Sequence, residues 1–147
     1  MTRDDVWERL RTVPDPEIPD VNIVDLGMIA GILISEGDVH ITLRPTFLGC
    51  PALDWIRASI EKALDPITTW VQFDMTSNWT AELITPHGRR QLQAFGIAPP
   101  VRDSRDVVCP LCGSHATHRT SPFGPTVCRA VYYCQGCEQP FEAWKTV

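Results

Sequence analysis

The chain has 147 residues, a length that fits one domain, or one domain of about 100 residues with a small appendage. Its hydrophobic fraction of 44% is enough for a core and excludes general disorder. The 13 basic and 18 acidic side chains give a formal net charge of −5, and the absence of a basic patch in either half argues against a nucleic-acid surface.

The start of the chain is charged and leads into no apolar run, so we expect no signal peptide. No stretch approaches the ~18 apolar residues of a membrane span. These features predict a cytoplasmic protein without a membrane partner. In that compartment, six cysteines are more often metal ligands or reactive thiols than disulfides.

A short helix is predicted at the N-terminus, where Thr2 can cap it, and a proline-rich acidic loop follows over residues 14–27. This acidic loop carries Asp15, Glu17 and Asp25. Its composition favours a solvated, capped loop. The alternative is a functional surface beside Cys50, because loops on rigid scaffolds often carry function.

Alternating apolar residues predict a β-hairpin, with strands over 28–34 and 39–43. A helix from Pro51 to about Leu64 then crosses over to a third strand at 70–75, which would lie parallel to the second. The predicted fold class is therefore α+β, with a small mixed three-stranded sheet and helices on one of its faces.

Cys50 stands directly before Pro51, between the second strand and the crossover helix. Proline suits the first position of a helix, so this order predicts Cys50 as the N-cap residue. There its sulfur would face free N–H groups and the positive end of the helix dipole, which favour the thiolate, the nucleophilic and metal-binding form. The alternative is a small buried cap residue.

Thr85 and Pro86 are predicted to open another helix, which ends before Gly96. Residues 98–106 begin Ala-Pro-Pro and are poor in apolar side chains, which is typical of a linker. We therefore predict a first domain over 1–97, a linker over 98–106 and a second domain over 107–147.

The second domain contains two Cys-x-x-Cys motifs separated by 21 residues. Strands predicted at Arg129–Tyr133 and Phe141–Trp144 would bring the motifs together as a four-sulfur site, the geometry of structural zinc in a ribbon-like domain. A rubredoxin-like iron site or a cluster is the alternative. The metal is needed for so small a domain to fold. The four predicted ligands, called here the ribbon cysteines, are Cys109, Cys112, Cys134 and Cys137.

A fifth cysteine, Cys128, directly precedes the strand predicted at Arg129–Tyr133. Strand alternation places it on one face with Ala130 and Tyr132, which favours a packed thiol over a ligand.

Several motifs resemble known families. Asp15-Pro-Glu-Ile-Pro, Asn22-Ile-Val-Asp-Leu-Gly27 and Thr46-Phe-Leu-Gly-Cys-Pro-Ala52 resemble the SufT-type iron–sulfur assembly family. The later part of the chain resembles the PaaD family of the phenylacetyl-CoA epoxidase system, and the two resemblances together cover nearly the whole chain. The resemblance to the PaaD family rests on five motifs: Thr85-Pro-His-Gly-Arg-Arg-Gln-Leu, Phe95-Gly-Ile-Ala-Pro-Pro, Cys109-Pro-Leu-Cys-Gly, Phe123-Gly-Pro-Thr-Val-Cys and Tyr133-Cys-Gln-Gly-Cys.

The resemblance implies a maturation factor rather than an enzyme. Its client would be the bacterial phenylacetyl-CoA ring 1,2-epoxidase of phenylacetate catabolism, either the iron–sulfur cluster of the reductase or the di-iron site of the oxygenase. Its partners would be those two proteins and the iron–sulfur assembly machinery. The resemblance assigns the functional thiol to Cys50 and the acidic loop to Asp15, Glu17 and Asp25, and it makes Cys128 a candidate further ligand.

Cys50 would hold iron or a cluster transiently, or contact the client. A single cysteine cannot hold a cluster that takes four thiolates, so a second copy, the client or a small thiol must supply ligands. A homodimer that brings two Cys50 residues together is one such arrangement. Two other functions stay open: a zinc-ribbon adaptor that bridges epoxidase subunits, and a thiol oxidoreductase, which would lack a resolving cysteine near Cys50.

Overall fold

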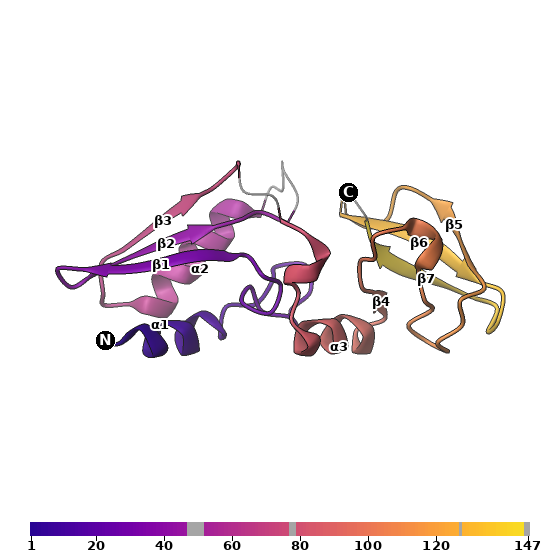
Figure 1. Ribbon diagram of the computed structural model, residues 1–147, viewed down its shortest axis with the longest axis horizontal. Coiled ribbons are helices and arrows are strands. Elements are labelled where there is room, and N and C mark those ends of the chain that lie inside the picture. The colour runs from indigo at the N-terminus through magenta and orange to yellow at the C-terminus, as the bar shows by residue number, and fades with distance from the viewer. Residues whose placement is uncertain (47–51, 77–78, 127, 146–147) are drawn as a thin grey trace. The chain divides into compact units, whose positions relative to one another are not determined.

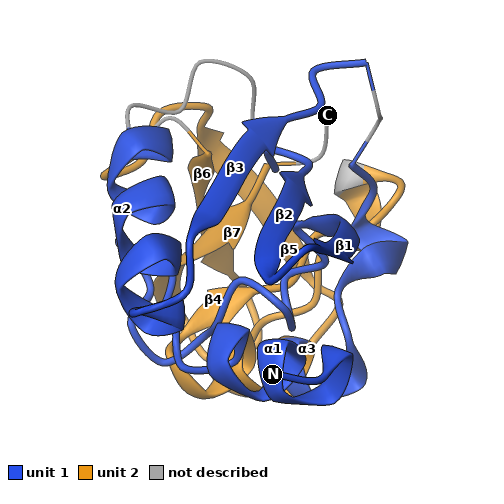
Figure 2. Ribbon diagram, turned by 90° about the vertical axis from the view of Figure 1, so that its left-hand side faces the viewer, with its two compact units in different colours: residues 1–88 blue, residues 89–147 orange. Residues whose placement is uncertain are grey.

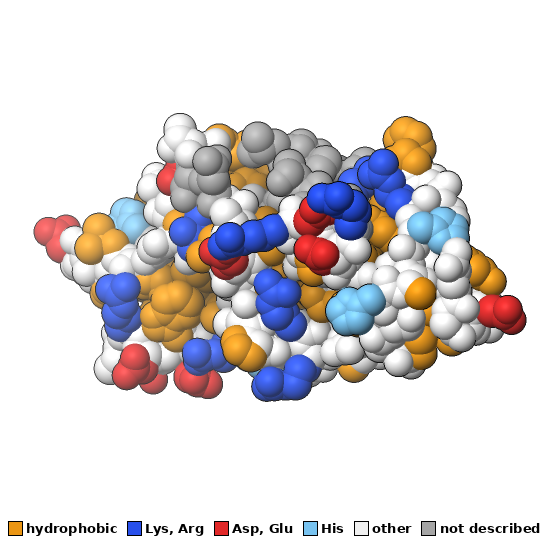
Figure 3. All heavy atoms as spheres, turned by 45° about the vertical axis from the view of Figure 1, so that its right-hand side comes forward, with side chains coloured by type: hydrophobic (Ala, Val, Ile, Leu, Met, Phe, Trp, Pro, Cys, Tyr) orange, Lys and Arg blue, Asp and Glu red, His pale blue; other side chains and the backbone are white. Residues whose placement is uncertain are grey.

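The computed structural model describes residues 1–46, 52–76, 79–126 and 128–145 (Figure 1). The chain forms two compact units, Met1–Gly88 and Arg89–Val147 (Figure 2). No helix in the described ranges is long and apolar enough to cross a membrane. On the face drawn in Figure 3, basic side chains lie among acidic ones.

Unit 1 is built on the mixed three-stranded sheet that the sequence predicts. Strands β1 (Ile29–Ser35) and β2 (Asp38–Leu43) form an antiparallel hairpin. Helix α2 (Leu53–Leu64) leads to β3 (Thr69–Phe73), which pairs parallel to β2, so the strand order is β1-β2-β3. Helix α1 (Arg3–Leu10) and α2 lie on the same side of the sheet (Figures 1 and 2), which confirms the predicted fold class.

The core of unit 1 lies between β2 and α2. Val39 and Ile41 are buried, whereas His40 between them is exposed, as strand alternation requires. Helix α2 contributes three buried side chains at helical spacing, Ile56, Ile60 and Leu64. Burial of one such side chain contributes roughly 1.5–3 kcal/mol.

The prediction that Cys50 caps the crossover helix is wrong. Helix α2 begins at Leu53, and Ala52 is its N-cap. The N–H of Ile56 donates the helical hydrogen bond to the carbonyl of Ala52, at 3.0 Å. Because the N-cap is the residue whose carbonyl accepts the first intrahelical bond, Pro51 is not the first helical residue. Cys50 itself lies outside the described residues.

Helix α3 (Pro86–Ala94) begins as predicted, with Thr85 as its cap. The Thr85 hydroxyl accepts a hydrogen bond from the N–H of Gly88 at 3.0 Å. Gly96, at φ +89°, follows the end of the helix. Leu92 is buried, whereas Phe95 is 43% exposed.

Unit 2 contains a second sheet, with strand order β4-β7-β6-β5. Strands β6 (Arg129–Cys134) and β7 (Gln139–Trp144) confirm the two predicted ribbon strands. Two further strands, β4 (Ile97–Ala98) and β5 (Thr117–Ser121), carry no alternation pattern that could have predicted them. The buried residues of unit 2 form a small apolar cluster of Ala98, Val107, Cys109, Ala130, Tyr132, Cys134, Phe141 and Ala143.

The predicted linker at residues 98–106 lies within unit 2. Ala98 belongs to β4, Val101 packs against the apolar cluster, and Ser104–Asp106 forms a turn of 3-10 helix. The division into domains at these residues stays a prediction.

Candidate functional site

The sulfurs of the four ribbon cysteines lie within 4.8 Å of one another in unit 2. The Sγ atoms of Cys109 and Cys137 are 3.8 Å apart, and those of Cys112 and Cys134 are 3.5 Å apart. Four sulfurs placed tetrahedrally at 2.3 Å from zinc would be about 3.8 Å apart. The donor set and its geometry therefore fit a structural zinc ion.

Two tight turns hold these sulfurs in place. In the first, the N–H of Gly113 donates to the carbonyl of Cys109 at 2.9 Å, and the N–H of Leu111 points at the Cys109 sulfur at 3.4 Å. Gly113 has a φ of +78°, which glycine adopts without strain. The second turn joins β6 to β7, where the backbone N–H of Cys137 lowers the pKa of the Cys134 thiol to about 6.

The two turns are also fixed to each other. The N–H of Gln135 donates to the carbonyl of Ala116 at 2.8 Å. Gly136 passes so close to Ser114 that a Cβ on this glycine would lie 2.9 Å from the Ser114 Cβ. Only glycine allows this approach without a shift of one turn, so the ligand geometry is built into the backbone.

Electrostatics favour a cation among the four sulfurs. Thiolates at these distances repel one another, and burial raises the pKa of the Cys137 thiol to about 12. A divalent ion removes both the repulsion between the thiolates and the cost of ionising the buried Cys137 thiol, because it neutralises the thiolates as it displaces their protons.

Cys128 lies away from this site. It is buried just before β6, whereas Cys134 ends the same strand six residues later, a distance of about 20 Å at 3.3 Å per residue. The Cys128 sulfur is 3.1 Å from the Thr126 hydroxyl. Ala130 and Tyr132 are buried with it, as predicted for a packed thiol. A role for Cys128 as a further ligand stays a prediction.

In the acidic loop of unit 1, Asp15 acts as a local cap. Its carboxylate accepts hydrogen bonds from the N–H groups of Glu17 and Ile18, at 2.9 and 3.0 Å. Its own N–H donates to the carbonyl of Val21 at 2.7 Å. The loop is further held by its own buried apolar side chains, Val13, Ile18, Val21, Ile23, Leu26 and Met28.

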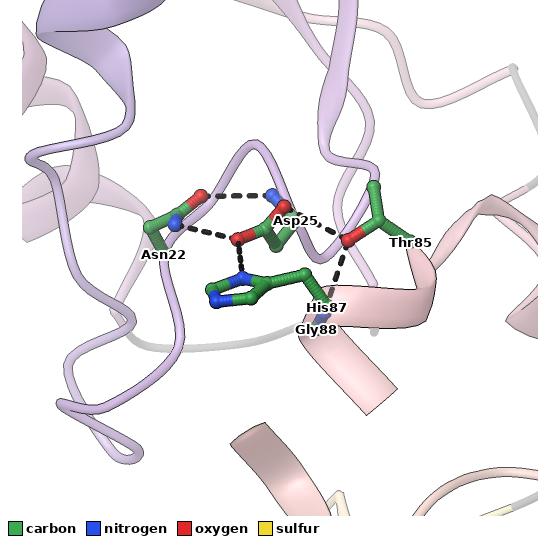
Figure 4. A network of polar contacts seen from close by, with 5 residues as sticks. All are labelled: Asn22, Asp25, Thr85, His87 and Gly88. Atoms are coloured by element: carbon green, nitrogen blue, oxygen red, sulfur yellow. Dashed lines mark hydrogen bonds and ion pairs between the residues drawn. The ribbon is translucent and has the colours of Figure 1, made fainter. Parts of the chain in front are cut away.

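Asp25 is the centre of a polar network that joins the acidic loop to the start of α3 (Figure 4). One carboxylate oxygen, Oδ2, accepts from Asn22 Nδ2 and lies 2.8 Å from His87 Nδ1; the other, Oδ1, accepts from the Thr85 hydroxyl at 2.8 Å. An ionised carboxylate only accepts, so His87 Nδ1 carries the proton of this contact. The backbone takes part as well, because the N–H of Thr85 donates to the Asp25 carbonyl at 2.9 Å.

The environment of Asp25 favours its ionised form. Burial alone would raise the pKa of this carboxyl, but the hydrogen bonds from His87, Thr85 and Asn22 outweigh it and hold the pKa below the ordinary value. The side chain is only 13% exposed. The expectation that Asp25 is a surface carboxylate is therefore wrong: it is a buried, bonded charge. Its assignment to a functional acidic loop stays a prediction.

A second set of contacts fixes the end of the acidic loop. The indole N–H of Trp79 donates to the carbonyl of Leu26 at 2.7 Å. Gly27, at φ +73°, has no room for a side chain, since a Cβ would lie 2.5 Å from the Leu83 carbonyl oxygen. The N–H of Arg44 donates to the carbonyl of Met28 at 2.7 Å. The loop thus ends against the residue that follows β2.

The sequence did not identify Asn22, Thr85 or His87 as partners of Asp25. The spacing of Asn22 and Asp25 was a local signal, because an Asn side chain commonly accepts from the N–H three residues later, here at 2.8 Å. Thr85 was identified only as a helix cap. Its contact with Asp25 crosses 60 residues and has no signature in a single sequence.

Of the sequence-predicted site residues, the structure brings the ribbon cysteines together and places Asp15 and Asp25 in one ordered loop. Cys50 belongs to residues 47–51, outside the described part of the chain, so its relation to that loop stays a prediction. The described residues on either side are Thr46, shortly after β2, and Ala52, the N-cap of α2.

Two family models match separate parts of the chain. Residues 3–75 match the family model described as iron–sulfur cluster assembly protein, and residues 98–145 match the PaaD zinc beta ribbon domain. An Escherichia coli (strain K12) protein, named as a subunit of 1,2-phenylacetyl-CoA epoxidase, is 37% identical over 155 residues, with 97% of this chain and 92% of that protein covered.

Other relatives match about three fifths of the chain. A protein of Porphyromonas gingivalis named Fe-S protein maturation auxiliary factor is 32% identical, over 62% of this chain and 90% of its own length. The solved structure of a domain of unknown function from Bacillus anthracis superposes with a TM-score of 0.57 and 25% identity, over 60% of this chain and 89% of that one.

Proposed function

We propose a function for this chain from the premise that it belongs to the PaaD family, in which an iron–sulfur cluster assembly domain precedes a zinc ribbon. Its role is to mature metal centres of a phenylacetyl-CoA epoxidase. The observation that carries this proposal is the match to the E. coli epoxidase protein across both domains. The relatives of the first domain are named maturation auxiliary factors, not catalysts, which supports a non-enzymatic role.

The working group in this proposal is the thiolate of Cys50, which holds iron or an iron–sulfur cluster as cargo. The described surroundings support it in one respect. Ala52, the N-cap of α2, has no side-chain acceptor, so the first N–H groups of the helix receive no capping bond from it. A thiolate close to the start of the helix would be stabilised by these groups. Further ligands come from the client or from a small thiol, because one cysteine does not complete an iron site.

The ribbon holds zinc as a structural ion through its four cysteines. When bound, zinc supplies no chemistry to the cargo; it fixes the fold of unit 2. Unit 2 then serves as the part that is specific to the epoxidase, because the maturation factors that lack it match only the first domain. The partners are the reductase and the oxygenase, whose iron–sulfur cluster and di-iron site are the two candidate clients.

Cys50→Ser tests the proposal in cells that grow on phenylacetate. The variant should accumulate as folded, zinc-containing protein, while the purified reductase or oxygenase lacks iron. Iron and acid-labile sulfide, measured separately on the two proteins, identify the client. Cys128→Ser, at the other cysteine outside the ribbon set, is measured in parallel: normal loading would remove Cys128 from the candidate ligands, and a defect would add it.

Full growth and full iron loading with Cys50→Ser would exclude the carrier mechanism. The zinc-ribbon adaptor would then take its place, in which the chain bridges the epoxidase subunits and Cys50 has no role.

A further inference from the structure

Strand β1 has an edge that no other strand of the described residues pairs with. It is the first strand in the order β1-β2-β3, so only one of its sides is paired. Its sequence, Ile-Ala-Gly-Ile-Leu-Ile-Ser, contains neither a charge nor a proline. Leu33 is 63% exposed and Ile34 is 37% exposed. Leu33 pairs with the exposed His40, whereas Ile34 pairs with the buried Val39, so the exposure of Ile34 is the one that marks the open edge.

Such an edge is unusual, because unpaired strands attract other strands and natural proteins blunt them with charges, prolines or short length. The edge strand β5 of unit 2 follows that rule, with His118 and Arg119 within five residues. Strand β1 has one feature that hinders the addition of another strand, the irregular pairing between Ile29 and Gly31. The remaining pairs from Ile32 to Ser35 are regular, and β1 itself carries no charge there, which leaves an edge suited to strand addition.

We propose that β1 pairs antiparallel with β1 of a second copy of this chain, so that two three-stranded sheets join into one of six strands about a two-fold axis. An isologous interface of this kind needs a patch that is complementary to itself. A strand without charges meets that condition, since two copies bring no like charges together. The inference is independent of the proposed function.

Pairing centred on Ile32, the middle residue of β1, also gives a steric match. It places Leu33 of one copy beside Gly31 of the other, on the same face of the joined sheet. A Cβ on Gly31 would meet nothing within 4 Å, so the space over this glycine is open. The protruding Leu33 side chain of the second copy fits that space. Glycine inside a strand is otherwise a weakness, and it often marks the close approach of another backbone.

The ends of the paired strands are complementary in charge. In this register Glu36, exposed at the hairpin turn, lies opposite Met28 of the other copy. Arg44 is beside Met28, because its N–H bonds the Met28 carbonyl and its guanidinium bonds the Ile29 carbonyl at 3.2 Å. Each copy therefore offers Glu36 to the Arg44 of the other, twice across the axis. This pairing of Glu36 with Arg44, made twice across the axis, is the reason for choosing a second copy of the chain as the partner over an unrelated strand.

Sedimentation velocity of the zinc-loaded chain, across a wide range of protein concentration, measures the association. A dimer is expected, and Leu33→Lys should convert it to a monomer, because it replaces the leucine that fills the space over Gly31 and puts two like charges on the same face near the axis. Phe95→Lys is the matched control: Phe95 is 43% exposed in unit 2, and its replacement should leave the dimer intact. Far-UV circular dichroism and zinc content check that both variants are folded.

Amide hydrogen exchange supplies a second, local measurement. The outward amides of β1 should be protected in proportion to the dimer present, and Glu36→Arg should weaken both the dimer and this protection at low salt. A chain that is monomeric at every concentration overturns the proposal. So does a dimer that survives Leu33→Lys, or a β1 edge that gains protection only when epoxidase subunits are added.

Discussion

Replacing Asp25 with asparagine changes one oxygen to an amide nitrogen in a site built for a carboxylate. The wild-type oxygens accept from Asn22, Thr85 and His87, each at 2.8 Å. An asparagine has one acceptor oxygen and one NH2 group, so at least one of these donors faces another donor. The variant also loses the charge that strengthens each bond.

The cost can be worked out from the geometry. The least costly arrangement turns the new NH2 toward Thr85, whose hydroxyl can rotate to accept it while it still accepts from Gly88. The oxygen then keeps its contacts with Asn22 and His87, without the charge. A hydrogen bond to a charged group is worth about 1.5–3 kcal/mol. We therefore expect Asp25→Asn to lower the free energy of unfolding of unit 1 by about 2 kcal/mol.

Denaturant unfolding followed by tryptophan fluorescence measures this loss. Four of the five tryptophans belong to unit 1, and the indole of Trp79 bonds the acidic loop itself. Asp20→Asn, the same change at an exposed position of the loop, should stay within about 0.5 kcal/mol of wild type. An Asp25→Asn protein as stable as the control would refute the structural role of the network and leave Asp25 with a purely functional role.

The same carboxylate predicts a dependence on pH. Because the pKa of Asp25 is lower in the folded chain than its ordinary value of 3.8, the ionised form favours folding. Its contribution is complete above pH 3.8 and is lost as the pH falls through the lower folded value. The difference in stability between wild type and Asp25→Asn should therefore be constant near neutrality and shrink in acid. A difference that grows as the pH falls would contradict the direction of the shift.

Further variants address the other features of the fold. Cys112→Ser should lose the zinc and unfold unit 2 while unit 1 keeps its own fluorescence transition, and a variant that retains a full equivalent of zinc would show the ligand set to be wrong. Gly27→Ala should destabilise unit 1 by more than about 2 kcal/mol, because it combines a left-handed φ with a Cβ contact of 2.5 Å at Leu83. Gly37 has φ +90° and open space around it, so Gly37→Ala tests the effect of the left-handed φ alone. It should lower the free energy of unfolding by about 1 kcal/mol.

Periodicity and spacing predicted the parts of the fold in which local chemistry decides the structure. The alternation at Val39, Ile41 and Leu43 located β2, and the cysteine spacing identified the four cysteines whose sulfurs lie together in unit 2. Strand β5 was not predicted, because Thr-His-Arg-Thr-Ser has no apolar side chain and owes its strand form to pairing with β6. Here the tertiary context outweighs the local sequence.

The start of α2 shows the limit of a local rule. Proline is favoured at the first position of a helix, but Pro51 precedes the first helical residue by two positions. Propensity alone could not place this boundary, because neighbouring start positions differ little in energy and helix ends are defined only within one or two residues. The partners of Asp25 were missed for a different reason: Thr85 and His87 lie 60 and 62 residues further along the chain, and no local pattern links them to it.

The Asp25 network changes how a loss of maturation should be interpreted for residues of the acidic loop. It ties Asn22 and Asp25 to the start of α3, and the loop ends at Met28 against Arg44, six residues before Cys50. A change at Asp25 can therefore abolish maturation by loosening the support of that region, with no contact to the cargo. A substitution at Cys50 removes the proposed ligand and leaves every bond of the network in place. Defects that scale with the stability of unit 1 across Asp25 variants would assign a supporting role to this residue, whereas a defect in a fully stable Cys50→Ser protein would assign the chemistry to the thiol.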